Sequence, residues 1–256
     1  MFGALPEEAD EVMEGVKSLH QKAIMLGLDA APTPHSPYTM SPKLLQLSSA
    51  EGLKSGFLSY HNQESSEEEE LLISGTGALA ENYKGRNMPT PPVTGKPALL
   101  YFIDNLKKIH PEPFTERILL VHNTVTNSES IDCALSTFEN VVWATCPLSN
   151  IFIHDMLAPY HLLRQKGCRI AIGTDSLSSN HLLSMVAEIR CIQEHHSEIP
   201  LSEILCWATL NGAVGVGKED IFGSFEVGKR PGAVIIDNID FNKFTLTPES
   251  KSKRIL

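Results

Sequence analysis

Short apolar runs that end in a polar or ionisable residue recur along this 256-residue chain and most constrain its fold. The clearest is Arg169–Asn180, RIAIGTDSLSSN, where Ile170–Ile172 lead through Gly-Thr to Asp175. Such a run, followed by a polar loop and then a helical pattern, is typical of a buried parallel strand. In barrel enzymes, an acid at the carboxyl end of such a strand lies on the face that carries the chemistry.

Five predicted strands end in this way, and helical patterns alternate with them. The predicted ends are His35, His61, His122, Cys146 and Asp175. Most are separated by roughly 25 to 30 residues, close to the ~31 residues of one βα unit in an eightfold barrel. The longest step contains the Pro- and Gly-rich segment 81–97, which predicts a long irregular loop. Because the carboxyl ends of parallel strands share one face, we expect His61, His122 and Asp175 to converge.

The first of these five strands, which leads to His35, is predicted over Leu28–Pro34. Two further segments have strand-like patterns, and one of them, Met1–Gly3, could be the stub of another strand. Ala233–Asp237 follows a turn at residues 228–232 (GKRPG) and is predicted to be a last buried strand. An acid-rich helix is expected from Glu67 to about Leu79. The whole pattern predicts an α/β fold.

Composition limits the partners and the compartment. The net charge of −10, with no Lys/Arg-rich run, argues against nucleic acid and anionic membranes as partners. No apolar run approaches the ~18 residues of a membrane span, and no signal peptide opens the sequence. The five cysteines are scattered, without a CxxC motif, as expected of reduced thiols. We therefore expect a cytoplasmic protein with a small-molecule substrate, and leave a homodimer open.

The predicted strand ends carry the chemistry of a hydrolytic metal site. Imidazole and carboxylate are ligands of zinc or iron, and such a metal lowers the pKa of its bound water to about 7. His61 and Asp175 are the predicted ligands, and His122 is either a third ligand or a substrate contact. Glu64 follows His61 by three residues, so it could carry a proton from the attacking water to a leaving group.

Each candidate also has a structural interpretation. Asp175 could cap the helix that follows it. Glu64 could belong to the solvated acidic run 67–70, and His61 and His122 could be packed core histidines. Stabilisation of the barrel rim or of the local loop is the alternative for the remaining candidates, which are His35, Ser178, Ser179 and Asn180.

Seven short motifs follow one another between about residues 30 and 236. They are PHSPY at 34–38, HNQE at 61–64, VHN at 121–123, CPLSN at 146–150, GTDSLSSN at 173–180, WATLNGA at 207–213 and FGSFEVGKRPG at 222–232. In order and spacing they resemble the C-terminal two-thirds of metal-dependent hydrolases of the amidohydrolase superfamily. The resemblance is to the chlorohydrolase/aminohydrolase branch, which includes cytosine, guanine and S-adenosylhomocysteine deaminases.

The resemblance implies hydrolytic deamination of an amino-substituted heterocycle by a metal-bound hydroxide. It implies His61 and Asp175 as ligands of one divalent metal, zinc or alternatively iron, with Asp175 also catalytic. Glu64 would carry the proton, and His122 would contact the attacking hydroxide or the substrate. The residues expected to contact the substrate are His35, Glu64, His122, Ser178 and Asn180.

The family takes two further ligands from an HxH motif on its first strand, and no HxH occurs in this sequence. We therefore expect an N-terminally truncated chain that lacks on the order of 100 residues. Residues 1–221 would form a partial TIM-type (β/α)8 barrel, with about strands 3 or 4 to 8. Residues 222–256 would be a remnant of a small β-sandwich domain.

Without the HxH ligands, we expect the metal to be weakly bound or absent and deamination to be impaired. A non-catalytic fragment, a degenerate paralogue and dehalogenation of the chlorohydrolase type are the alternatives. The sequence leaves open the identity of the substrate.

Overall fold

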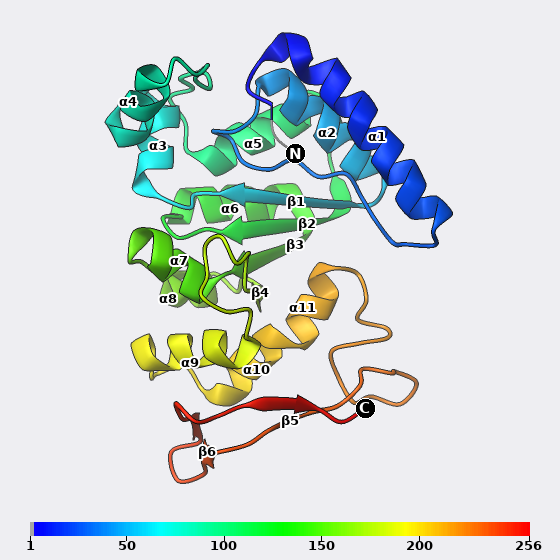
Figure 1. The fold of residues 1–256 in the computed structure, drawn as a ribbon, viewed down its shortest axis with the longest axis vertical. Helices are drawn as coiled ribbons and strands as arrows, with labels where there is room; N and C mark the ends of the chain where they lie inside the picture. The colour runs from blue at the N-terminus through cyan, green and yellow to red at the C-terminus, as the bar shows by residue number, and fades with distance from the viewer. Residues whose placement is uncertain (1–2) are drawn as a thin grey trace. The chain divides into compact units, whose positions relative to one another are not determined.

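The structure of the chain is a computed structural model that describes residues 3–256 (Figure 1). The chain forms two compact units, Met1–Val141 and Val142–Leu256. Across the described residues, no helix has the length and apolar character needed to cross a lipid bilayer.

Unit 1 contains a pair of parallel strands and the helices that pack on them. The strands are β1 (Phe57–Asn62) and β2 (Phe114–His122). They pair in parallel, with Phe57 opposite Arg117 and His61 opposite Val121. The helices are η1 (Pro6–Glu8), α1 (Ala9–Met25), α2 (Pro42–Lys54), α3 (Ser66–Ser74), α4 (Gly77–Gly85), α5 (Ala98–Lys107) and α6 (Ser128–Thr137).

The core of unit 1 fixes the direction in which β1 delivers its last residues. Leu58 and Tyr60 are fully buried, and the Tyr60 ring stacks on Phe102 of α5 with 4.0 Å between ring centroids. Helix α2 packs against both β1 and α5 (Figure 1). Successive side chains of a strand point to opposite faces. Burial of Leu58 and Tyr60 on one face of β1 therefore directs the His61 side chain to the other face.

Unit 2 contains the second parallel pair. Strand β3 (Phe138–Thr145) begins at the end of unit 1, and in unit 2 its Trp143 lies opposite Ile170 of β4 (Ile170–Ile172). All three residues of β4 are buried, as the apolar run predicts. The helices are α7 (Pro147–His154), α8 (Tyr160–Gln165), α9 (Met185–His195), α10 (Leu201–Ala208) and α11 (Leu210–Gly215).

Four short strands complete unit 2. They are β5 (Val234–Ile236), β6 (Ile239–Asp240), β7 (Thr245–Leu246) and β8 (Ser252–Arg254). Strand β5 pairs antiparallel with β8, and β6 pairs antiparallel with β7. Helices α10 and α11 pack on β4 (Figure 1). Helix α9 packs on β7.

The prediction of an α/β fold with parallel strands is confirmed, but the predicted strand at 28–34 is wrong. Residues 28–36 form no strand. The segment contacts β1 through separate bonds instead: the Thr33 hydroxyl bonds the backbone of Ser59, and the carbonyl of His35 accepts from the amide of His61. Pro32 and Pro34 have no N–H, so a regular ladder cannot form here.

Other elements differ from their predicted extents. The acid-rich helix ends at Ser74, because Gly75 adopts a left-handed conformation at φ 70°, and α4 follows it. Strand β5 is exposed rather than buried, with Val234 at 58% and Ile235 at 52%, because it lies in a two-stranded ribbon. Residues 1 and 2 of the predicted strand stub lie outside the described residues, and Gly3 forms one parallel bridge with Met40.

Two helical glycines of unit 1 provide a test of this packing. A Cβ on Gly52 of α2 would lie 2.7 Å from the carbonyl oxygen of Pro32 and 3.0 Å from that of Phe57, whereas a Cβ on Gly15 of α1 would meet nothing within 4 Å. We expect Gly52→Ala to lower the free energy of unfolding by about 1–3 kcal/mol through overpacking. Gly15→Ala is expected to raise it by up to about 1 kcal/mol through helix propensity. Urea unfolding of both variants measures the difference, and equal effects would contradict the close approach of α2.

Candidate active site

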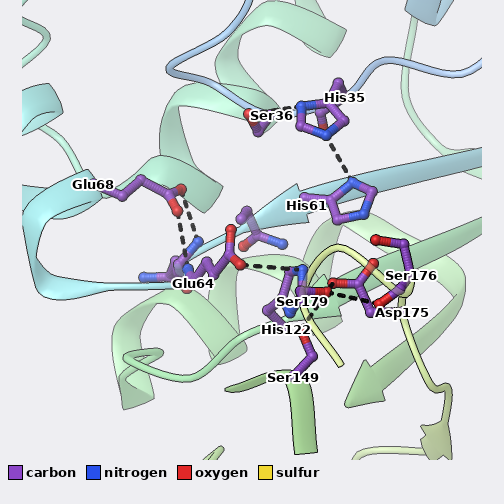
Figure 2. A network of polar contacts seen from close by, with 12 residues as sticks. His35, Ser36, His61, Glu64, Glu68, His122, Ser149, Asp175, Ser176 and Ser179 are labelled. Carbon is purple, nitrogen blue, oxygen red and sulfur yellow. Dashed lines mark hydrogen bonds and ion pairs between the residues drawn. The ribbon is translucent and has the colours of Figure 1, made fainter. Parts of the chain in front are cut away.

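Three histidine rings lie in a row in unit 1 (Figure 2). His61 belongs to β1, His122 is the last residue of β2, and His35 comes from the extended segment beside β1. The ring centroids of His35 and His61 are 4.8 Å apart, and those of His61 and His122 are 5.2 Å apart. Unit 1 therefore brings together the three histidines that the strand pattern singles out.

The carbonyl of His35 orients the His61 ring. It accepts a hydrogen bond from the backbone N–H of His61 at 2.9 Å and lies 3.3 Å from its Nδ1. Because a carbonyl can only accept, Nδ1 carries the proton, which leaves Nε2 as the nitrogen that the neutral ring can offer to a metal. A backbone carbonyl on one ring nitrogen is a typical partner of a histidine that binds metal through the other.

The side chain of His35 has its own partners. Its Nδ1 lies 3.0 Å from the hydroxyl of Ser36 and 2.9 Å from that of Thr39. These bonds fix the imidazole at the end of the row. They are compatible with both interpretations of His35, a structural residue and a substrate contact.

Glu64 is a buried and bonded carboxylate. Its Oε2 accepts a hydrogen bond from the Tyr38 hydroxyl at 3.1 Å. Its Oε1 lies 3.6 Å from Nε2 of His122 (Figure 2), which is also buried. Burial, and then the negative charge of Glu64, hold the pKa of Tyr38 above its ordinary value, so the phenol remains a donor. Glu64 is therefore not part of the solvated acidic run that follows it.

Four non-glycine residues at or just after the ends of the strands that carry the candidate site residues have left-handed backbone conformations. Gln63 has φ 49°, His122 has φ 70°, Asn123 has φ 56° and Asp175 has φ 55°. Side chains larger than glycine rarely adopt this conformation, which costs on the order of 1 kcal/mol or more and is common at functional sites. The strain must be offset by contacts of the turns themselves.

Asp175 follows β4 in unit 2 and is held by two hydroxyls. Its Oδ2 accepts hydrogen bonds from Ser149 at 2.8 Å and from Ser179 at 2.6 Å (Figure 2). Ser149 belongs to the first turn of α7 and is fully buried, as is most of Ser179. Asp175 is thus positioned by two segments of unit 2. The predicted contact Ser178 is exposed, and its backbone N–H bonds the Ser176 hydroxyl instead.

Glu188 of α9 connects the two segments that position Asp175. One of its oxygens accepts from the backbone N–H of Leu148 and the other from the side-chain amide of Asn180, both at 2.8 Å. The same amide of Asn180 donates to the carbonyl of Thr174 at 2.9 Å. Asn180 therefore stabilises the loop, and its role as a substrate contact stays a prediction. Burial raises the pKa of Glu188 to about 7.

Several residues of the site were not identified from the sequence. Tyr38 and Ser149 lie inside motifs whose histidine or loop drew attention instead. Glu188 lies in a helix pattern, where nothing marks it as bonded to a loop. Among residues 3–256, no group of three or more His, Cys, Asp and Glu side chains is arranged to hold a metal ion.

Comparison with known proteins identifies the family. The profile of the amidohydrolase family matches residues 5–253, nearly the whole chain. The chain belongs to the amidohydrolase family. Its relatives include the 5-methylthioadenosine/S-adenosylhomocysteine deaminase of Teredinibacter turnerae, 33% identical over 129 residues, which are 48% of this chain and 29% of that protein. The adenosine deaminase of Helicobacter pylori is 29% identical over 224 residues, 79% of this chain and 48% of that protein.

Solved structures of amidohydrolases resemble this chain in fold. The crystal structure of Helicobacter pylori aminofutalosine deaminase matches it with a TM-score of 0.68 and 26% identity, over 86% of this chain and 55% of that one. A Xanthomonas campestris adenosine deaminase matches with a TM-score of 0.61 and 23% identity, over 80% of this chain and 43% of that one. This amidohydrolase thus spans about half the length, or less, of the relatives that it matches.

Glu188 should give this amidohydrolase a pH-dependent stability. The pKa of this carboxyl group is about 7 in the folded chain and roughly 4.5 in the unfolded chain. The folded state therefore holds the proton more tightly, and this stabilises the fold fully at pH values below the unfolded-state pKa. That stabilisation is lost as pH rises through 7, on the order of 3 kcal/mol in all. We expect Glu188→Gln to remove this decline between pH 5 and pH 8, measured by urea unfolding with a chelator present. Glu249→Gln removes the same charge from an exposed side chain of unit 2 and should keep the decline.

The neighbouring serines Ser178 and Ser179 provide a matched pair. Only the Ser179 hydroxyl is buried and bonded to Asp175, so Ser179→Ala should lower the free energy of unfolding by about 1–2 kcal/mol. Ser178→Ala, at an exposed position, should change it by less than about 0.5 kcal/mol. Thermal unfolding of the two variants decides, and a larger loss for Ser178→Ala would contradict this hydrogen-bond pattern.

Proposed function

We propose that this chain carries part of the active site of a metal-dependent hydrolase that deaminates an amino-substituted heterocycle. The observation that carries the proposal is the buried carboxylate of Glu64, which lies between the Tyr38 hydroxyl and the His122 ring. In the sequence, Glu64 follows the proposed ligand His61 by three residues. Family membership supports hydrolysis, and the names of the relatives support deamination of an adenine-containing nucleoside.

Members of the family are generally metal-dependent, and the donor groups of this chain fit a divalent cation. The His61 ring is oriented through Nδ1 by a carbonyl, and the Asp175 carboxylate is held by two hydroxyls. We propose both as ligands of one ion, zinc or alternatively iron. When bound, such an ion lowers the pKa of its water to about 7 and supplies hydroxide.

That His61 and Asp175 bind the same ion stays a prediction from the strand order. A catalytic zinc site has about three protein ligands, and no HxH motif occurs in this sequence. We therefore expect the affinity of this chain for zinc to be weak.

The residues of unit 1 would handle the protons of the reaction. Glu64 takes a proton from the attacking water and gives it to the amino group, so that the C–N bond breaks and ammonia leaves. Tyr38 donates to one Glu64 oxygen, which directs the proton to the oxygen that faces His122. His122 is 2% exposed and packs beside the His61 ring, and we propose that it contacts the attacking water or the substrate. His35, Ser178 and Asn180 are proposed substrate contacts.

The fold of the complete catalytic unit is also a proposal. We propose that the parallel strands of this chain are consecutive strands of a TIM-type barrel, which is supported by the likeness to aminofutalosine deaminase. Residues 222–256 would belong to a small β-sandwich domain. The exposed apolar side chains of Phe225 and Val227 are compatible with a surface that another layer covers.

Ammonia release from 5′-methylthioadenosine, S-adenosylhomocysteine and adenosine, with excess zinc, tests the function. We expect metal-dependent turnover that Glu64→Gln lowers at least about 100-fold without a change in zinc binding, because it removes the proton carrier. His61→Ala should weaken zinc binding about 10-fold or more, measured by calorimetry, because it removes a ligand. His161→Ala, an exposed histidine of unit 2, is the control and should leave both unchanged.

Two outcomes would overturn the proposal. Equal zinc binding by the parent chain and His61→Ala, together with no turnover, would favour a non-catalytic chain. Chloride release from a chlorinated triazine, without ammonia release from any nucleoside, would favour dehalogenation.

A further inference from the structure

The turn between β1 and α3 sets the position of Glu64, and its backbone is strained. Gln63 adopts a left-handed conformation directly after the last residue of β1. Its carbonyl accepts from the backbone N–H of Val125 at 3.0 Å, and its side-chain amide donates to the Ser130 hydroxyl at 3.3 Å. These bonds hold one side of the turn, so the N–H groups on the other side need partners of their own.

Glu68 supplies both partners. Its Oε1 accepts from the backbone N–H of Gln63 and its Oε2 from that of Glu64, each at 2.9 Å (Figure 2). The side chain is completely buried. Hydrogen bonds to a carboxylate are short and strong compared with neutral ones. One side chain therefore closes the turn from within the helix that follows it.

This arrangement differs from an ordinary helix cap. Helix α3 has its cap in Ser65, whose hydroxyl accepts from the backbone N–H of Glu68 at 3.2 Å. In a capping box, an acid three residues after the cap bonds the backbone N–H of the cap residue itself. Glu68 reaches further back, to the two residues before Ser65. Its bonds therefore hold the Glu64 backbone as well as the start of the helix.

The bonds described bring no cation to the Glu68 carboxyl group. Burial raises the pKa of Glu68, and the N–H bonds from Glu64 and Gln63 act in the opposite direction. Glu69 and Glu64 lie nearby and add negative charge. A buried acid is a costly way to close a turn, so a neutral side chain would suffice if only the helix start needed a cap.

We propose that Glu68 is a positioning residue that holds the carboxylate of Glu64 between the Tyr38 hydroxyl and His122. The inference rests on the proposed role of Glu64 in proton transfer. Glu68 holds the backbone, Tyr38 holds Oε2, and Oε1 is left facing His122. A displacement of the carboxylate by as little as 1 Å is enough to slow a proton transfer strongly.

The test compares Glu68→Gln with Ser65→Ala. Glutamine has the shape of glutamate but only one acceptor, and it turns its NH2 toward the second N–H of the turn. Ser65→Ala removes the other cap bond of the same helix and leaves the Glu64 N–H bonded. If Glu68→Gln does not fold, Glu68→Asp keeps the carboxyl group and shortens the reach, with the same loss expected.

Two readouts are independent of turnover. In Glu68→Gln, the backbone amides of Gln63 and Glu64 should exchange with solvent about 10-fold faster or more, as for a lost buried hydrogen bond. The ¹⁵N chemical shift of His122 Nε2 should also change, because the carboxylate facing it moves. Ser65→Ala should alter neither signal.

The third readout is turnover. We expect Glu68→Gln to lower kcat about 10- to 100-fold with KM unchanged, and Ser65→Ala to stay within about 2-fold of the parent. An unchanged His122 shift and unchanged kcat in Glu68→Gln would overturn the inference. If Glu64→Gln itself leaves ammonia release unchanged, the proposed function fails. The amide exchange and the His122 shift then still decide whether Glu68 positions Glu64.

Discussion

Buried carboxylates that accept hydrogen bonds from loops hold the strand ends on which the candidate site depends. Two of these carboxylates lie in helices that follow strands, Glu68 in unit 1 and Glu188 in unit 2. A carboxylate has two oxygens and can therefore join two loop donors at once, which a hydroxyl or an amide does less well. Without these bonds, backbone N–H groups of the loops would be unpaired, and the loops would not fix the positions of Glu64 and of the segments around Asp175.

The sequence predicted the parts of the fold that local pattern determines. A short, fully apolar run such as Ile170–Ile172, followed by a polar loop, predicts a buried parallel strand, and β4 forms there. The same reasoning placed His61 and His122 at the ends of neighbouring parallel strands, and the structure pairs those strands in register. It failed at 28–34, where two prolines remove the donors that a strand needs although the apolar pattern is present.

The supporting residues were not predictable in the same way. Glu68 is one of four consecutive glutamates, and only the path of the chain shows that it points inward while Glu70 is exposed. The left-handed residues Gln63 and His122 carry no glycine signal. Their conformation depends on tertiary bonds that offset the strain. Residue type and spacing identify groups that could do chemistry, whereas the groups that hold them in place depend on contacts between distant segments.

The proton-handling groups and the second proposed ligand differ in how they are supported. Glu64, Tyr38 and His122 belong to unit 1, where Glu64 accepts a hydrogen bond from Tyr38 and faces His122 at 3.6 Å, so their arrangement needs no metal to hold it. Asp175 belongs to unit 2 and has its own hydroxyl partners. Each part is therefore preorganised by its own loops, as electrostatic catalysis requires. A change in metal affinity should leave the geometry around Glu64 intact, and a change in the turn at Gln63 should leave that around Asp175 intact.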